Sequence, residues 1–260
     1  MDHSGGRRNC GSGAAPSRRN RDARRICESN RAIKRSELDM GMGDIDLRHR
    51  IAKRAAQEIE DGMIVNLGIG IPTLAADYIP SHYEVWLHAE NGIMGAGASP
   101  LQGEEDPNLC NAGGFPITLT KGGSYMDSTT AFGIIRKGML DMTILGALEV
   151  SSQGDLANWI VPGKRVPGMG GAIELAQKAK KVVVVMSHLD KHGRSKVKTA
   201  CTLPLTAKAC VDLIITDMAV IEVKSQLLIL REVMPPFQPE DVIRATEAPL
   251  ILAPDIKSVV

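Results

Sequence analysis

Apolar side chains recur at helical spacing in the segment that follows Asp46. They share one face when the segment is wound as an α-helix, and they are Leu47, Ile51, Ala52, Ala55, Ala56 and Ile59. Asp46 is a residue type that caps helix N-termini, and Gly62 is a residue type that ends helices. We therefore expect an amphipathic helix that begins at Asp46 and stops at Gly62.

Short apolar runs follow along the chain and predict strands. They span residues 63–67, 85–88, 142–145, 182–186 and 213–216. Helix-like stretches such as residues 172–179 lie between them, and strands that alternate with helices form parallel sheets. The predicted fold class is α/β, with an open, mostly parallel sheet that is covered by helices.

Two further apolar runs, residues 219–223 and 227–233, flank a short polar connection at residues 224–226. This arrangement predicts a hairpin added to the edge of the sheet. Pro239 is expected to open a short helix after the hairpin, because proline is favoured in the first turn.

The turn Gly68-Ile69-Gly70 after the first predicted strand resembles half of a dinucleotide-binding fingerprint. Thr73 stands where the third glycine of that fingerprint belongs, so a nicotinamide site is not expected. The plainer interpretation is a tight turn in which the backbone comes close to a ligand or to a neighbouring loop.

Residues 1–41 are rich in Gly, Ser, Asn and Arg and show no hydrophobic period, so we expect a disordered basic extension before a single domain at 42–260. The first 39 residues hold ten of the 31 basic and five of the 30 acidic side chains, which leaves a mildly acidic body. Those acidic residues argue against an organelle-targeting peptide. A basic nucleic-acid arm and a translation start at Met40 or Met42 are the other interpretations.

Composition narrows the classes of function. Aromatic residues make up 3% of the chain, which excludes modules that stack nucleic-acid bases on aromatic rings, and no nucleic-acid partner is expected. The five cysteines include no C-x-x-C pair and no histidine lies at metal-ligand spacing. We expect free thiols, no metal site and a cytoplasmic protein. No apolar run is long enough for a membrane helix, so no membrane association is expected.

One stretch carries candidate chemistry, His88-Ala89-Glu90-Asn91-Gly92-Ile93-Met94-Gly95-Ala96-Gly97. Its carboxylate follows an apolar strand, and open α/β sheets bind ligands at the carboxyl ends of their strands. A lone glutamate there is more often a helix cap or an ion-pair partner, so the pattern alone leaves catalysis open.

His88 lies two residues before Glu90. It is expected to pack behind Glu90, and the alternative is that it acts as a general base. His188, like three other histidines, lies in a polar context that suits solvent or capping.

The stretch resembles the Glu-Asn-Gly-x-x-Gly-x-Gly signature of the family I (3-oxoacid) coenzyme A transferases, and specifically of their B subunit, also called the beta subunit. Further segments that resemble the family follow in the same order, at residues 66–72, 111–113, 154–159, 162–164, 168–172 and 201–206. The resemblance covers roughly residues 45–250, and it implies the CoA-transferase (NagB/RpiA-like) fold.

The resemblance implies that Glu90 is the covalent nucleophile and that the backbone amide of Gly171 is an oxyanion donor. Gly170, Gly92 and Asn91 correspond to the lining of the acyl and thioester site. Asn158 would also line this site, although it could equally be a turn residue before Trp159. No cofactor is implied, because coenzyme A thioester is itself a substrate, and no metal ion is implied.

The implied activity is transfer of coenzyme A from succinyl-CoA or a short-chain acyl-CoA to a 3-oxoacid such as acetoacetate. It would proceed by ping-pong through a glutamyl-CoA thioester. The implied partner is the A subunit of the family, in an A2B2 heterotetramer. Residues 121–127 differ from the succinate-using enzymes of the family, which leaves the acid donor open. The alternatives are a non-catalytic ligand-sensing relative on the same scaffold and a sugar-phosphate isomerase, for which no phosphate cradle is found.

Overall fold

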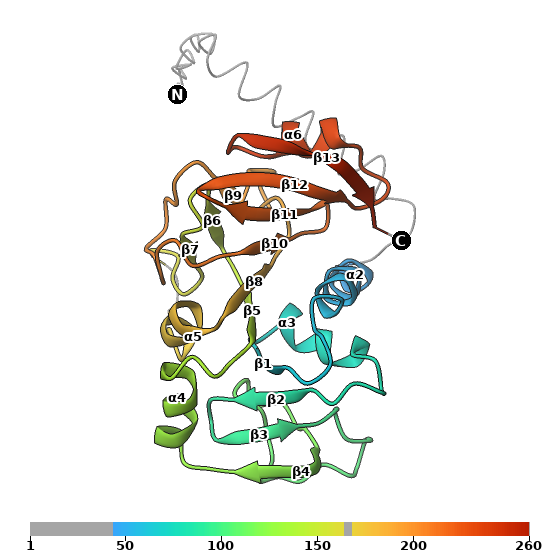
Figure 1. The fold of residues 1–260 in the computed structure, drawn as a ribbon, viewed down its shortest axis with the longest axis vertical. Coiled ribbons are helices and arrows are strands. Elements are labelled where there is room, and N and C mark those ends of the chain that lie inside the picture. Colours follow the sequence, from blue (N-terminus) through green and yellow to red (C-terminus); the bar gives the residue numbers. More distant parts are fainter. Residues whose placement is uncertain (1–43, 164–167, 260) are drawn as a thin grey trace, which may run out of the picture.

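A single large sheet organises the protein in a computed structural model that describes residues 44–163 and 168–259. Its ten strands run in the order β13-β12-β11-β10-β8-β5-β1-β2-β3-β4 (Figure 1). The five central strands are parallel, and they are β10 (Leu213–Ile215), β8 (Lys181–Val185), β5 (Met142–Gly146), β1 (Ile64–Leu67) and β2 (Trp86–Ala89). The predicted parallel sheet is confirmed, with each of the five predicted strands within one residue of its expected place.

Antiparallel strands extend the sheet at both ends. Beyond β2 lie β3 (Ile93–Ala96) and β4 (Leu119–Tyr125), neither of which was expected. Beyond β10 the predicted hairpin forms as β11 (Ala219–Lys224) and β12 (Leu227–Val233). Its expected place at the sheet edge was wrong, because β13 (Leu250–Ser258) pairs in parallel with β12 and is itself the outermost strand.

The outermost strand β13 is irregular. Its pairing with β12 shifts register between Leu252 and Lys257, and the segment between them contains Pro254 and Asp255. Ile251 and Leu252 on the same strand are half exposed. The edge of the sheet therefore combines apolar side chains with a bulge, a proline and charges.

Helices cover both faces of the sheet (Figure 1). One face carries α2 (Asp44–Ala56), α3 (Ile71–Leu74) and the 3-10 helix at Ala75–Tyr78, and the other carries α4 (Ser128–Arg136) and α5 (Ala172–Lys178). The short helix α6 (Pro239–Ala245) begins at the expected proline. The first helix begins at Asp44 and ends at Ala56, six residues before the predicted stop at Gly62. The predicted extension at residues 1–41 lies outside the described residues.

Two apolar layers form the core, one on each face of the sheet. Ile51 of α2 packs with Val65, Met142 and Val183 on one face, whereas Ile135 of α4 packs with the opposite face. Val, Ile, Leu, Ala and Met supply almost all of the buried apolar side chains, as expected for a parallel sheet covered by helices. Among the described residues no helix is long and apolar enough to cross a membrane.

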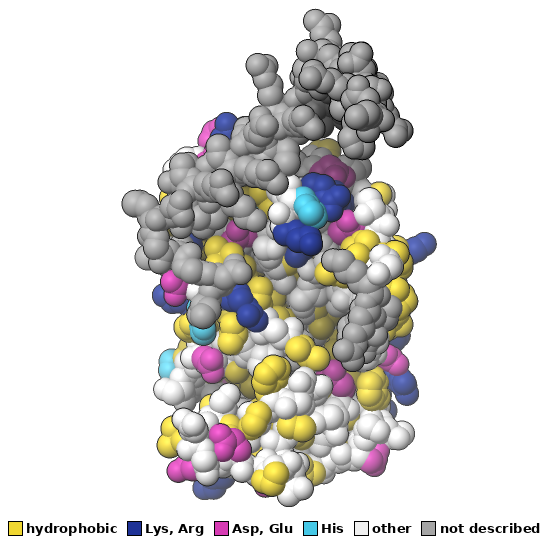
Figure 2. All heavy atoms as spheres, turned by 180° about the vertical axis from the view of Figure 1, so that it is seen from behind, with side chains coloured by type: hydrophobic (Ala, Val, Ile, Leu, Met, Phe, Trp, Pro, Cys, Tyr) yellow, Lys and Arg dark blue, Asp and Glu magenta, His cyan; other side chains and the backbone are white. Residues whose placement is uncertain are grey.

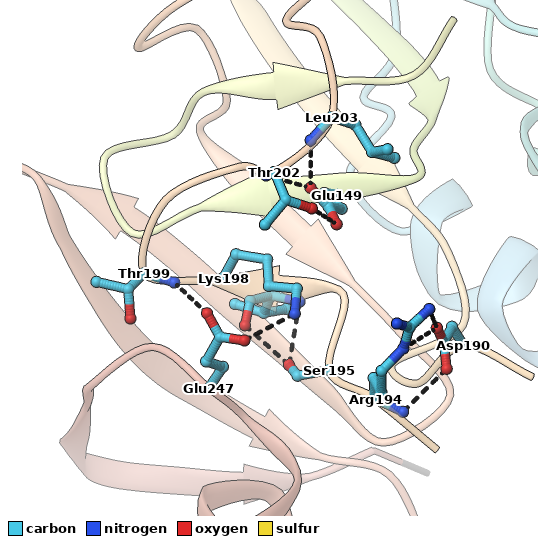
Figure 3. Close-up of polar contacts among 10 residues, drawn as sticks. Glu149, Asp190, Arg194, Ser195, Lys198, Thr199, Thr202, Leu203 and Glu247 are labelled. Atoms are coloured by element: carbon cyan, nitrogen blue, oxygen red, sulfur yellow. Dashed lines mark hydrogen bonds and ion pairs between the residues drawn. The ribbon is translucent and has the colours of Figure 1, made fainter. Parts of the chain in front are cut away.

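A second, three-stranded sheet of β7 (Leu156–Ala157), β6 (Glu149–Ser151) and β9 (Val197–Lys198) fastens the long loop after β8. The carboxylate of Glu149 accepts hydrogen bonds from the backbone N–H groups of Thr202 and Leu203 at 2.6 and 3.0 Å. Lys198 forms an ion pair of 2.7 Å with Glu247 (Figure 3). These contacts join the loop to β6 and to the segment after α6, so its backbone is fixed.

Charged side chains are intermixed on the face turned away in Figure 1. Figure 2 shows basic side chains there singly or in small groups among acidic and apolar ones. Among the coloured residues of this face, the basic side chains form no continuous stripe. Nucleic-acid binding needs such a continuous basic surface.

His188 lies at the carboxyl end of β8 and is fully buried, so the expectation that it suits solvent or capping was wrong. The hydroxyl of Thr246 donates to the carbonyl of Val242 at 2.6 Å and therefore accepts from Nε2–H of His188 at 2.9 Å. The hydroxyl of Thr216 lies 3.0 Å from the other ring nitrogen, Nδ1, and 3.2 Å from the carbonyl oxygen of Ala219, so its one proton is shared between these two acceptors. Both ring nitrogens are satisfied by a neutral imidazole, which links β8 to α6 and to the β10–β11 turn.

This histidine predicts a loss of stability in acid. Burial lowers the pKa of His188 from 6.5 to about 4. The unfolded chain takes up a proton near pH 6.5 and the folded chain only near pH 4, so folding stability is complete above pH 6.5 and falls as the pH drops towards 4. The loss amounts to at most about 3 kcal/mol. Urea unfolding of the wild type and of His188→Gln at several pH values tests this. In the variant, the unfolding free energy should lose most of its dependence on pH. An unchanged dependence would show that other groups cause the loss of stability in acid.

Candidate active site at the carboxyl end of the central strands

Glu90 is the first residue after β2, in the tight turn that leads into β3. The turn is closed by a hydrogen bond of 3.0 Å from the N–H of Gly92 to the carbonyl of Ala89. Gly92 has φ +113°, and a Cβ at this position would lie 2.1 Å from the carbonyl oxygen of Met126. Only glycine can occupy this position, so the turn that aims the Glu90 side chain depends on Gly92.

A buried asparagine holds the Glu90 carboxylate. Asn66 lies on β1 next to His88 of β2, and its Nδ2 donates to Oε2 of Glu90 and to the carbonyl of His88, both at 3.1 Å. Its Oδ1 accepts from the hydroxyl of Thr143 on β5 at 3.4 Å. Asn66 is 1% exposed, so this hydrogen bond is sheltered from water. It fixes one carboxylate oxygen, and Oε1 has no hydrogen-bond partner among the described residues.

His88 lies beneath the carboxylate and is 2% exposed. Its Nε2–H donates to the carbonyl of Ala131 in α4 at 3.2 Å, so Nδ1 is the unprotonated nitrogen and faces the Asn66 amide at 3.5 Å. Burial lowers the pKa of His88, although the Ala131 carbonyl and the Glu90 carboxylate oppose this shift. His88 is therefore neutral and supports the site by packing, in line with the favoured expectation.

Gly171 brings the backbone of another element to Glu90. It is the N-cap of α5, and a Cβ on it would lie 3.4 Å from Cγ of Glu90 and 3.3 Å from the ring of Phe132. The absence of a side chain thus lets the backbone approach the carboxylate. No acceptor is found among the described residues for the Gly171 N–H. The neighbouring Gly170 has φ +55° and open space around its Cα.

The remaining predicted residues have structural partners. Nδ2 of Asn91 donates to the carbonyl of Cys110 at 2.8 Å, which fastens the loop beside Glu90. Asn158 accepts a hydrogen bond of 2.6 Å from the hydroxyl of Thr206, and its own N–H donates to that hydroxyl oxygen at 3.2 Å. The structure thus brings Glu90, Gly92 and Gly171 together, whereas no hydrogen bond joins Asn158 to Glu90.

Asn66 is a site residue that was not singled out from the sequence. The sequence did contain a signal for it, because Asn66 is the one polar residue within the otherwise apolar strand Ile64–Leu67. A buried polar side chain on a central strand requires partners, and here the partner is the candidate nucleophile.

Burial and nearby charge argue against two of the described cysteines, Cys201 and Cys210, as alternative nucleophiles. Cys110, Cys201 and Cys210 are free thiols, as expected, and Cys10 and Cys27 lie outside the described residues. Burial raises the pKa of Cys201 and of Cys210 to about 12, so neither forms the reactive thiolate at neutral pH. Among the described residues no three or more His, Cys, Asp or Glu side chains are placed together to hold a metal ion.

Comparison with known proteins identifies one family. The family described as coenzyme A transferase matches residues 48–245. The chain is 61% identical over 209 residues to the beta subunit of a probable coenzyme A transferase of Bacillus subtilis, a match that covers 80% of this chain and 96% of the relative. It is 48% identical over 202 residues to the B subunit of the succinyl-CoA:3-ketoacid coenzyme A transferase of Helicobacter pylori, covering 78% of this chain and 97% of the relative.

A longer relative and solved structures are also similar. The human mitochondrial succinyl-CoA:3-ketoacid coenzyme A transferase 2 is 44% identical over 227 residues, which cover 86% of this chain and 44% of that protein. An acyl-CoA transferase of Escherichia coli O157:H7, solved as a thioester complex with CoA, superposes with a TM-score of 0.66 at 20% identity, over 85% of this chain and 44% of that one. The decarboxylase AibA/AibB gives a TM-score of 0.65 at 18% identity, over 84% and 90% of the two chains. At these identities the structures establish the fold alone.

Proposed function

This chain belongs to the coenzyme A transferase family, and from this premise we propose that it is the B subunit, which carries the nucleophile Glu90. The proposed reaction moves coenzyme A from succinyl-CoA or a short-chain acyl-CoA to a 3-oxoacid such as acetoacetate. The observation that carries the proposal is the Glu90 carboxylate, held at one oxygen by Asn66 and next to the backbone of Gly171. The names of the relatives support the substrate class.

The first half of the reaction loads coenzyme A onto the protein. The free oxygen of Glu90 attacks the acyl-CoA carbonyl, the carbon–sulfur bond breaks, and the coenzyme A thiolate leaves a mixed anhydride behind. The thiolate then attacks the carbonyl carbon of Glu90 and releases the first acid as its carboxylate. A glutamyl-CoA thioester remains, so the energy of the thioester is retained on the protein.

The second half runs the same steps with another acid. Its carboxylate attacks the glutamyl thioester and expels the thiolate, which then attacks the acyl carbonyl of the new anhydride. The products are the new acyl-CoA and free Glu90. The first acid leaves before the second acts, which gives ping-pong kinetics, and coenzyme A thioester is a substrate rather than a cofactor.

The surrounding residues suit these steps. Each addition creates an oxyanion, and the unpaired N–H of Gly171 at the N-cap of α5 would stabilise it by ~2 to 4 kcal/mol. Asn66 keeps one oxygen of Glu90 in place, so the other is directed towards the substrate. Neutral His88 supports Asn66 without competing for a proton.

A second polypeptide is part of the proposal. Glu90 is only half buried, and water would hydrolyse both the anhydride and the thioester. Beside Glu90, the loop fastened by Asn91 exposes Phe115, which with Ile69 flanks Gly113; these two apolar side chains are 56% and 64% exposed. We propose that the A subunit of the transferase covers this surface in an A2B2 heterotetramer, in the cytoplasm.

Reconstitution tests the proposed function. The purified chain alone should turn over acetoacetate and succinyl-CoA poorly. Adding the A subunit should raise the rate at least a hundredfold with a saturable dependence, because half of the site wall is then supplied. Full activity from this chain alone would contradict the proposal. Binding of coenzyme A without turnover, in the assembled protein and with a panel of acids, would favour the ligand-sensing alternative.

A further inference from the structure

A second pocket lies at the carboxyl ends of β5 and β8, and the proposed reaction does not use it. It has a volume of about 290 Å³. Polar and apolar groups share its walls. Leu47 of α2 and Ile71 of α3 are partly exposed there, whereas Ile51 of α2 and Val185 of β8 border the pocket but are almost completely buried. A pocket of this volume suits a small ligand.

The topology of the sheet places this pocket where ligands bind. From β1 the chain passes through α3 to β2 on one side, whereas β5, β8 and β10 follow on the other side of β1. The strand order therefore reverses between β1 and β5, and open α/β sheets bind ligands outside the carboxyl ends of the strands at such a switch point. Gly146 at the end of β5 and Ile69 after β1 both line the pocket.

The pocket is separate from the Glu90 site. It lies against Ile51 of α2, which packs on one face of the sheet. Glu90 faces Gly171 of α5, and His88 beside it bonds to α4, which covers the opposite face. The sheet and the turn after β1 lie between the two sites.

Lys196 gives the pocket a positive charge. The backbone N–H of Lys196 donates to the carbonyl of His188 at 2.9 Å, and the backbone carbonyl of Lys196 accepts from the N–H of Val150 at 3.0 Å. The neighbouring Ser195 is further tied to the loop (Figure 3), so the backbone that carries Lys196 is fixed.

The ammonium group of Lys196 has no ion pair or hydrogen bond within the described part of the chain. Burial lowers the pKa of Lys196 to about 8, against the nearby carboxylates of Asp217 and Asp190. Lys196 is half-buried, and a partly desolvated cation without a close partner is stabilised by an anion that enters beside it.

We propose that this pocket binds a short-chain monocarboxylate, with its carboxylate on the ammonium of Lys196 and its hydrocarbon part against the partly exposed Leu47 and Ile71. A cation held beside two partly exposed apolar side chains matches an anion with a small apolar body. A phosphate would require a cradle of backbone N–H groups or a second paired cation, and the exposed Arg48 at the rim is not held in place for this role. The proposal does not rest on the transferase reaction, because it concerns binding away from Glu90.

Titration of the full chain with butyrate, followed by methyl NMR without coenzyme A, tests the proposal. Methyl signals of Leu47, Ile51, Ile71 and Val185 should shift with saturable dependence. Lys196→Gln should weaken this binding at least tenfold, because the charge-assisted hydrogen bond is lost. Lys191→Gln, on an exposed lysine of the same loop, should bind butyrate like wild type, and so should Glu90→Gln.

Three results would overturn the proposal. They are normal binding by Lys196→Gln, the absence of saturable shifts in wild type, and shifts that disappear in Glu90→Gln, which would place butyrate at the other site. If Lys196→Gln does not fold, as judged by its thermal midpoint, Leu47→Trp replaces it. This substitution at a half-exposed position of α2 fills the pocket, and unchanged butyrate affinity in it would equally contradict the proposal.

Discussion

Glu90→Gln is expected to abolish coenzyme A transfer while leaving the thermal midpoint and coenzyme A binding close to those of the wild type. The amide keeps the size of the side chain and can keep a contact with Asn66, but it lacks the anionic oxygen that attacks the thioester. A loss of at least a thousandfold in turnover, measured on the protein assembled with the A subunit, is the expected result. Glu84→Gln is the matched control, since Glu84 is an exposed carboxylate just before β2, and it should retain full activity.

The covalent step can be observed directly. With acyl-CoA and no acceptor acid, the assembled wild-type protein should accumulate a glutamyl-CoA thioester, which borohydride reduces to an alcohol on that side chain. Mass spectrometry should place the change on the peptide that contains Glu90. Glu90→Asp should also fail, since a shorter side chain withdraws the carboxylate from the reacting carbon. Normal turnover by Glu90→Gln, once deamidation to glutamate is excluded, or a label on another residue would show that the nucleophile is elsewhere.

Gly92→Ala is the second substitution with a large expected effect. The new Cβ would lie 2.1 Å from the Met126 carbonyl oxygen, a backbone atom that cannot rotate away, at a residue with φ +113°. The β2–β3 turn must shift, which should lower stability by roughly 3 kcal/mol through strain and overpacking. Turnover should fall at least a hundredfold, because Glu90 moves with the turn.

Gly62→Ala is the control for the backbone conformation alone. Gly62 has φ +81°, and a Cβ there meets no atom within 4 Å. This variant should lose only about 1 kcal/mol of stability and none of its turnover. Equal effects of the two substitutions on activity would show that positive φ, rather than the contact with Met126, determines the result.

The central strands were predictable because their apolar runs are continuous and buried on both faces. The outermost strands β4 and β13 were not, for reasons visible in their sequences. The strand β4 contains Gly122 and Gly123 and is mostly exposed, and β13 contains Pro254 and charged residues. The strand β4 has no apolar run, and the run at residues 250–253 of β13 is interrupted at once by Pro254 and Asp255. Pairing with a neighbouring strand holds each of them in the sheet.

The candidate site was predictable only where the sequence itself is distinctive. Glu90, Gly92 and Gly171 belong to segments whose glycines and acidic residue resemble the family. Asn66 gains its role from the register of β1 against β2, which local sequence does not contain. His188 was misjudged for the same reason, since its polar neighbours in the chain say nothing of the threonines from β10–β11 and α6 that enclose it.

The irregular edge at β13 bears on how the protein behaves when it is concentrated. An open sheet ends in unpaired backbone groups that invite a strand of another molecule, and exposed Ile251 and Leu252 would favour such an addition. A strand added there would meet Pro254, which has no N–H to offer, and would bring Asp255 and Lys257 out of water. The bulge between Leu252 and Lys257 also breaks the straight template that fibril growth copies. These features of β13 therefore oppose polymerisation of the protein through this edge of the sheet.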